Sequence, residues 1–152
     1  MTVDAGVVVL VVTLVVVAIV GVVWRRRQGT VRVSSQAPPL DPALLNELGV
    51  TLGARGTLIQ FSTAFCQPCR ATRQVLARVA AAAPGVAHVD VDAESHLAAV
   101  RALRIHSTPT TLILDGDGRE RHRATGVPHL AQVYAALGVS APAAADLRGG
   151  AR

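Results

Sequence analysis

The 152-residue sequence contains no lysine, only two cysteines and only four aromatic residues, which are one Trp, one Tyr and two Phe. Scarce aromatic side chains argue against binding of single-stranded nucleic acid, which relies on base stacking against such side chains. A structural zinc site usually has four ligands in two pairs, and two cysteines supply only one of these pairs. All fifteen basic residues are arginines, and this usage, with abundant Ala, Val and Gly, indicates a GC-rich bacterial genome.

The net charge of +5 is concentrated in one place. Arg25, Arg26, Arg27 and Arg32 form a cluster, and without these four and Asp4 eleven arginines stand against nine acidic residues. That balance is ordinary for a protein surface, so we expect no nucleic-acid binding. The cluster is better interpreted as a membrane-topology signal that also contacts anionic lipid.

Residues 5–24, AGVVVLVVTLVVVAIVGVVW, contain no charged side chain. As a helix this run is about 30 Å long, the thickness of the hydrocarbon core of a bilayer. A cleaved signal peptide fits less well, because the preceding MTVD is acidic and no small-x-small cleavage site follows. We therefore expect a single-pass anchor in the cell membrane, with Trp24 at the interface. The arginines after it predict that the rest of the chain lies on the cytoplasmic side.

The remaining sequence divides into a basic juxtamembrane segment and linker at 25–40, a folded domain at 41–138 and a disordered tail at 139–152. TVRV, within the linker, is expected as a short edge strand. Hydrophobic periodicity and turn residues predict a helix at 41–49, a strand at 56–62, a helix from the cysteines to Pro84, a strand at 85–93, a helix at 94–103, a hairpin at 108–126 and a helix at 127–138.

This order of elements predicts an α/β fold. Strands separated by helices imply parallel crossovers, and the hairpin implies an antiparallel edge, so we expect a mixed central sheet with helices on both faces. The helix after the cysteines is amphipathic, and its buried face is expected to carry Ala71, Val75, Leu76, Val79 and Ala82 or Ala83.

Both cysteines lie in FSTAFCQPCRATRQ, residues 61–74, where two residues separate Cys66 from Cys69. No metal is expected, because there is no second cysteine pair and the five histidines form no pair at ligand spacing. A purely structural disulfide is also disfavoured, because its loop is too small to constrain the unfolded chain and the cytoplasm keeps thiols reduced. The remaining alternative is a redox centre.

The position of the cysteines suits redox chemistry. Cys66 stands where a strand and a short loop meet a helix, so free N–H groups and the helix dipole favour its thiolate. Arg70 and Arg73 are expected to add positive charge nearby. Cys69 lies one turn further and is shielded, and Pro68 is tolerated in the first turn of a helix. Cys66 would attack a partner disulfide, and Cys69 would then displace the product.

Residues 57–138 resemble the thioredoxin family. TLIQFSTAFCQPCR resembles the family's strand, aromatic residue and C-x-P-C active site. IHSTPT lies forty residues beyond Cys69, where the family has a cis-proline, and DGDGRERHRATG resembles the last hairpin and the glycine after it. Three motifs in order at matching spacing make the resemblance specific. It implies a thioredoxin fold, here preceded by one transmembrane helix.

The resemblance also implies roles for residues. Cys66 is the nucleophile and Cys69 the resolving thiol of a redox-active disulfide, and Pro109 is a cis-proline that packs beside it in the catalytic site. Thr108 offers backbone hydrogen bonds to an extended substrate, a form of strand addition. The substrate-binding surface is completed by the residues around the cysteines, Phe65, Gln67 and Pro68.

The chain also departs from the family. Gln60 stands where a buried Asp usually accepts the proton of the resolving cysteine, and a neutral amide cannot take a proton. Phe65 replaces the usual Trp. His88 falls where a buried Lys is common, and it would substitute there as a titrating group, since histidine ordinarily titrates near neutrality. A half-exposed strand position is the simpler interpretation. The compact spacing lacks the insertions of exported cytochrome-maturation thioredoxins and of disulfide oxidases, and so resembles reducing members.

The sequence thus predicts a membrane-tethered reductase of protein disulfides. No metal or organic cofactor is expected, because the electrons reside on Cys66 and Cys69. The expected partners are protein disulfide substrates, an upstream dithiol or reductase that donates electrons, and membrane lipid around the anchor of a monomer. Two alternatives remain, which are a thioredoxin-fold binding module with little redox turnover and an extracytoplasmic thiol–disulfide exchange protein.

Overall fold

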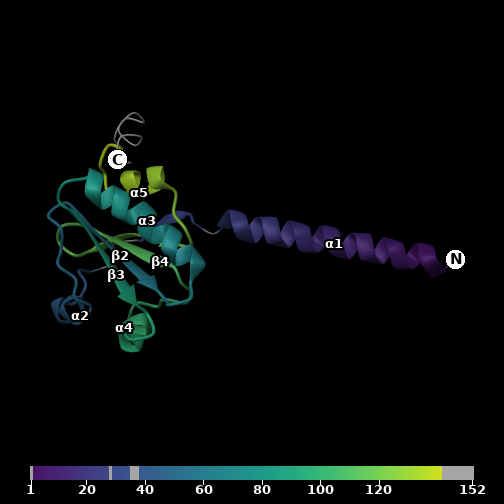
Figure 1. The fold of residues 1–152 in the computed structure, drawn as a ribbon, viewed down its shortest axis with the longest axis horizontal. Coiled ribbons are helices and arrows are strands. Elements are labelled where there is room, and N and C mark those ends of the chain that lie inside the picture. The colour runs from purple at the N-terminus through teal and green to yellow at the C-terminus, as the bar shows by residue number, and fades with distance from the viewer. Residues whose placement is uncertain (1, 28, 35–37, 142–152) are drawn as a thin grey trace.

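The structure is a computed structural model that describes residues 2–27, 29–34 and 38–141. Figure 1 shows its first helix, α1 (Thr2–Arg27), extending away from an α/β domain. Residues 6–23 of α1 are long and apolar enough to cross a membrane and are not buried in the protein, although a signal sequence has the same features. The side chain of Trp24 and most of the predicted tail, residues 142–152, lie outside the described residues.

A five-stranded sheet forms the centre of the domain. Its strands are β1 (Val31–Val33), β2 (Gly56–Ser62), β3 (Val86–Asp92), β4 (Thr110–Leu114) and β5 (Glu120–Thr125). They lie in the order β1-β5-β4-β2-β3. β2 and β3 are parallel, whereas the other neighbours are antiparallel. The predicted mixed sheet is confirmed, and the TVRV segment supplies an edge strand as expected.

Helices cover both faces of this sheet (Figure 1). Those of the domain are α2 (Pro42–Glu47), α3 (Gln67–Ala82), α4 (Leu97–Ala102) and α5 (Leu130–Ala136). Residues of α2 and α4 pack against one face, and residues of α3 and α5 pack against the other. The crossover through α3 explains the parallel pairing of β2 with β3, because consecutive parallel strands need a connection of this length.

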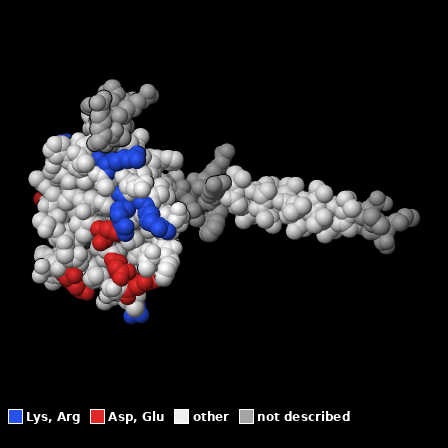
Figure 2. Space-filling view, viewed as in Figure 1, with Lys and Arg blue, Asp and Glu red and all other residues white. Residues whose placement is uncertain are grey.

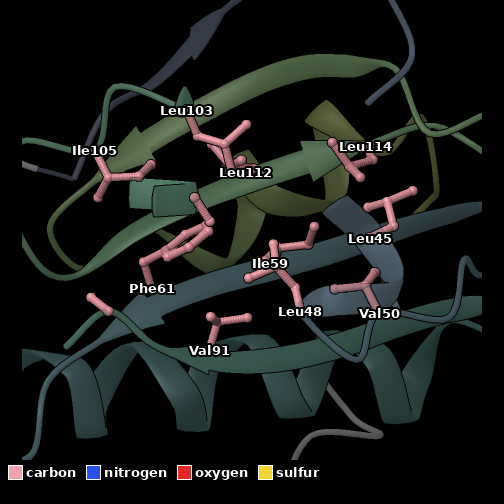
Figure 3. Packing of buried hydrophobic residues seen from close by; sticks show 12 residues of the cluster. Leu45, Leu48, Val50, Ile59, Phe61, Val91, Leu103, Ile105, Leu112 and Leu114 are labelled. Carbon is pink, nitrogen blue, oxygen red and sulfur yellow. The ribbon is translucent and has the colours of Figure 1, made fainter. Parts of the chain in front are cut away.

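The side chains of β2 alternate between two hydrophobic cores. Ile59 and Phe61 point toward α2 and α4, where Figure 3 shows them packed with Leu112 of β4. Leu58 points to the opposite face and packs with Leu76 of α3. All seven residues of β2 are buried, which explains why its sequence is largely apolar rather than alternating.

Local signals set the ends of α2 and α3. The carboxylate of Asp41 accepts a hydrogen bond from the N–H of Ala43 at 2.9 Å, so Asp41 is the predicted N-cap. Gly49 follows α2 with φ 65°, a left-handed conformation that glycine adopts without strain. Pro68 occupies the first turn of α3, where its missing N–H leaves no helical hydrogen bond unmade.

Two predicted helices are shorter than expected. The helix predicted at 94–103 begins only at Leu97, because the carboxylate of Asp92 binds the N–H of Glu94 and the hydroxyl of Ser95 in a turn. The helix predicted at 127–138 begins only at Leu130, because its N-cap His129 is extended, with φ −76° and ψ 135°. Pro128 in addition disfavours helical geometry at Val127.

Two predictions about packing are wrong. Ala71 is exposed, and Thr72 takes its place on the buried face of α3. The hairpin does not form the edge of the sheet, because β1 adds to β5 through the antiparallel pair Val31 and Ala124. Both errors concern which neighbour a residue or strand meets in space, and neither changes the fold class.

Leu76 and Leu97 allow a matched test of the core beneath α3. Leu76 is fully buried, whereas Leu97 is 54% exposed. We expect L76A to lower the free energy of unfolding by about 2–5 kcal/mol, because it removes buried methyl groups and leaves a cavity. The same change at the exposed position, L97A, should alter it by only about 0.5 kcal/mol. Urea unfolding followed by circular dichroism measures both, and equal losses would contradict the packing described.

Candidate active site

Cys66 and Cys69 form a disulfide at the start of α3, with an S–S distance of 2.01 Å. Cys66 is the N-cap of the helix, and its Sγ accepts a hydrogen bond from the N–H of Cys69 at 3.2 Å. This contact uses one of the N–H groups that a helix leaves unpaired at its first turn. The sulfur of Cys66 therefore lies where N–H groups and the helix dipole stabilise negative charge.

The two sulfurs differ in access to solvent. Cys66 is partly exposed, whereas Cys69 is 1% exposed on the buried side of α3. The predicted shielding of the second cysteine is confirmed. A bulky partner can reach only the first sulfur, because the second is buried.

Two arginines flank the disulfide, but their guanidinium groups have other partners. Arg70 donates a hydrogen bond from Nη2 to Oε1 of Gln67 at 2.8 Å. Arg73 forms an ion pair with Asp90 of β3. Both arginines line the pocket beside Cys66, as expected, but only Arg70 keeps its full positive charge there, because Gln67 is neutral whereas Asp90 offsets the charge of Arg73. The N–H of Cys69 at the helix N-terminus contacts the sulfur of Cys66 directly.

A pocket of about 280 Å³ opens beside both cysteines. Its wall includes Arg70 and Arg73 of α3 together with Asp90 and Asp92 of β3. Figure 2 shows basic and acidic side chains next to each other on the face of the domain that carries α3. The pocket is therefore polar, with charges of both signs close to the sulfurs.

Sequence reasoning missed Asp90 and its partners. Oδ1 of Asp90 accepts a hydrogen bond from the hydroxyl of Ser62 at 2.6 Å, and Oδ2 pairs with Arg73. Only the parallel pairing of β2 with β3 brings these residues together, since it sets Gln60 beside Asp90 and Ser62 beside Asp92. The available signal was the position of polar residues at the carboxyl ends of neighbouring parallel strands, where α/β sheets bind ligands.

The loop before β4 lies next to the loop that carries the cysteines. The peptide bond between Thr108 and Pro109 is cis, as predicted. The hydroxyls of Thr63 and Thr108 are 3.5 Å apart, and the carbonyl of Pro109 accepts a hydrogen bond from the N–H of Gly126 at 2.8 Å. Within the described chain, the backbone of Thr108 makes no hydrogen bond.

Phe65 is the most unusual surface residue near the disulfide. Its side chain is 98% exposed, directly before Cys66. An exposed aromatic ring leaves a large apolar area in water, and such rings commonly anchor protein partners.

Among the described residues, no group of three or more His, Cys, Asp or Glu side chains is arranged to hold a metal ion.

His88 lies half-buried on β3, as the simpler interpretation of its sequence position predicted, and its Nε2 has no partner among the described residues. Burial lowers the pKa of His88, the charge of Asp90 opposes this effect, and the charge of Arg73 adds to it. Because the unfolded chain then binds the proton more readily, the fold should lose stability as pH falls below the unfolded value of about 6.5.

We expect H88Q to lose less stability than the parent chain when the pH is lowered from about 7.5 to about 5.5, a range that spans the ordinary histidine pKa. Urea unfolding of the full chain in detergent at both pH values measures the difference. The exposed His106 provides a control, since H106Q should retain the parent's pH dependence. An unchanged pH dependence in H88Q would show that another group is responsible.

Solved structures show the same fold at low sequence identity. The oxidised form of mitochondrial thioredoxin 3 from Saccharomyces cerevisiae is 18% identical, with a TM-score of 0.53 over 62% of this chain and 88% of that one. Thioredoxin from Fasciola hepatica is 23% identical, with a TM-score of 0.51 over 63% and 86% of the two chains. A designed protein is 22% identical, with a TM-score of 0.52 over 70% and 94%. A comparison with curated proteins finds no match.

A family model described as Thioredoxin matches residues 49–137, more than half of the chain. That range contains the cysteine pair, the cis peptide bond before Pro109 and the final hairpin. The disulfide between Cys66 and Cys69 is accordingly of the redox type, which supports thiol–disulfide oxidoreductase chemistry in general. The chain belongs to the thioredoxin family.

Proposed function

We propose that this protein is a membrane-tethered oxidoreductase that reduces protein disulfides through Cys66 and Cys69. The observation that carries the proposal is the unequal environment of the two sulfurs. Cys66 is accessible and caps α3, whereas Cys69 is 1% exposed and lies within bonding distance of it. One sulfur is thus placed to attack and the other to resolve.

The reaction consists of two exchanges. In the reduced protein the Cys66 thiolate attacks one sulfur of a substrate disulfide, forms a mixed disulfide and releases the first substrate thiolate, which takes a proton from water. The Cys69 thiol then loses its proton and attacks Sγ of Cys66. This forms the bond between Cys66 and Cys69 and releases the second substrate thiol. Two electrons pass to the substrate, and an upstream dithiol protein or reductase must restore them.

The substrate would lie across the surface around Cys66. The exposed ring of Phe65 offers an apolar anchor. Thr108 would pair its backbone with an extended substrate segment beside the cis-proline Pro109. Gln67 and Pro68 are exposed at the start of α3 and would border the same segment. Such a surface suits protein substrates, because it combines an apolar anchor with backbone groups that can pair with an extended segment.

Replacing each cysteine separately tests the roles. We expect C69S to accumulate a mixed disulfide with substrate proteins, because the resolving thiol is gone, whereas C66S should form none. Non-reducing electrophoresis after acid quenching measures both. If the two variants trap equally, the assignment of nucleophile is wrong. If the double variant C66S/C69S keeps the cellular role, the protein is a binding module rather than an oxidoreductase.

The anchor and orientation are the second part of the proposal. The apolar helix α1 would hold the domain at the membrane and raise its local concentration near membrane partners. Arg25, Arg26 and Arg27 at its end favour a cytoplasmic domain. A domain on that side would meet a reducing environment, which is consistent with a reductase.

After mild reduction, we expect a bulky, membrane-impermeant maleimide to label Cys66 only once cells are permeabilised, because the domain lies inside. The two cysteines are the only ones in the chain, so any label reports on this site. Acid trapping of growing cells should find them mostly as thiols. Labelling of intact cells would place the domain outside, and a predominantly oxidised pair would indicate an oxidant instead of a reductase.

A further inference from the structure

Gln60 lies directly beneath the resolving cysteine. It belongs to β2, has no exposed surface, and donates a hydrogen bond from Nε2 to the carbonyl oxygen of Cys69 at 2.9 Å. A carbonyl oxygen only accepts hydrogen bonds, so the amide nitrogen must face it. Oε1 of Gln60 is therefore the amide's remaining polar atom, and it has no partner among the described residues.

The sheet around Gln60 offers Cys69 no free base. Its neighbour on β4 is Thr111, a neutral buried residue. Its neighbour on β3 is Asp90, whose two carboxylate oxygens already bind Ser62 and Arg73. The hydroxyls of Thr72 and Thr111 are also buried without a partner among the described residues, and they are neutral as well. The group that contacts the backbone of Cys69 is a neutral amide.

The other charged groups facing this region are also engaged or lie at its edge. The carboxylate of Asp92 binds the N–H of Glu94 and the hydroxyl of Ser95. Arg70 is held by Gln67. His88 lies on the same strand as Asp90, but it does not line the pocket beside the sulfurs.

We propose that Gln60 keeps the Cys69 thiol protonated and so makes the second exchange depend on a base from solvent. The inference rests on the proposed function. When the disulfide is open, Oε1 of Gln60 accepts a hydrogen bond from the Cys69 thiol, and this stabilises the thiol over the thiolate that must attack. The amide cannot take the proton. The proton therefore passes to a water or buffer base that enters the pocket beside Cys66 and Cys69.

This arrangement makes Gln60 a positioning residue with a kinetic effect. The first exchange uses the Cys66 thiolate and does not require Gln60. The second waits for deprotonation of Cys69, so the mixed disulfide with the substrate persists. The consequence is a protein that captures a substrate quickly and releases it slowly, at a rate set by pH.

The test follows both exchanges in the full chain in detergent. The reduced protein is mixed with a stoichiometric nitro-aromatic disulfide whose thiol product absorbs visible light. The attack of Cys66 releases a first equivalent, and the attack of Cys69 releases a second. In the parent chain the second phase should quicken about tenfold for each pH unit below the Cys69 pKa. It should also quicken with buffer concentration at constant pH and ionic strength.

Q60E is nearly isosteric and supplies a carboxylate next to Cys69. Because an internal base commonly accelerates proton transfer by about 10²–10⁴-fold, we expect its second phase at neutral pH to be at least about tenfold faster and independent of buffer concentration. T111V is the matched control, since Thr111 is buried on the neighbouring strand, and it should leave both phases unchanged. The dependence of the second-phase rate on buffer concentration is measured in the parent chain, so it tests the proposal even if Q60E does not fold.

Each outcome separates this inference from the proposed function. Absence of the first phase would remove the proposed function itself. Two phases with a second whose rate does not depend on buffer concentration would leave that function standing and overturn the role of Gln60. A folded Q60E that resolves no faster would do the same. A buffer-independent second phase that D90N makes buffer-dependent would assign the proton to Asp90 instead.

Discussion

The central strand β2 is hydrogen-bonded to β3 on one side and to β4 on the other, and all seven of its residues are buried. Its position fixes the site from two directions. The chain leaves its carboxyl end and turns into α3, which places Cys66 at the helix N-terminus. The antiparallel pair Phe61 and Thr110 brings the cis-proline loop to the same end, so Thr63 and Thr108 come into contact. Both loops therefore meet without any covalent link.

The sheet face beneath α3 is apolar at one end and polar at the other. At one end Leu58 and Ile113 pack against Leu76, and this apolar contact holds the helix on the sheet. At the other end Gln60 and Thr111 lie beneath the first turns of α3. Burying these polar side chains costs stability unless they are hydrogen-bonded, and Gln60 recovers part of the cost through the carbonyl of Cys69. The residues that stabilise the contact between helix and sheet thus lie at one end of the interface, and those next to the disulfide lie at the other.

The two sulfurs are covalently identical and differ only in their surroundings. Both are cysteines in one turn of one helix, yet only Cys66 is reachable from solvent. Its sulfur meets an N–H group of the helix, whereas Cys69 meets a neutral amide through its backbone. In the proposed mechanism the same residue type takes two roles, because Cys66 is accessible beside a donor that stabilises its thiolate, whereas Cys69 is shielded from partners. The exposed ring of Phe65 adds an apolar surface beside the reachable sulfur.

The sequence by itself determined the strand at 56–62, the cap at Asp41 and the helix that begins after Cys66, because each depends on neighbours within a few residues. The cysteine spacing and the motif before Pro109 were likewise enough to predict the family and the cis peptide bond. Only the tertiary structure decided that β1 joins β5, that Thr72 rather than Ala71 faces the sheet, and that Asp90 pairs with Arg73. These features depend on strand order, on the rotation of a helix against the sheet and on side chains brought together from separate elements. Local periodicity carries none of that information, because it records which face is apolar but not which partner that face meets.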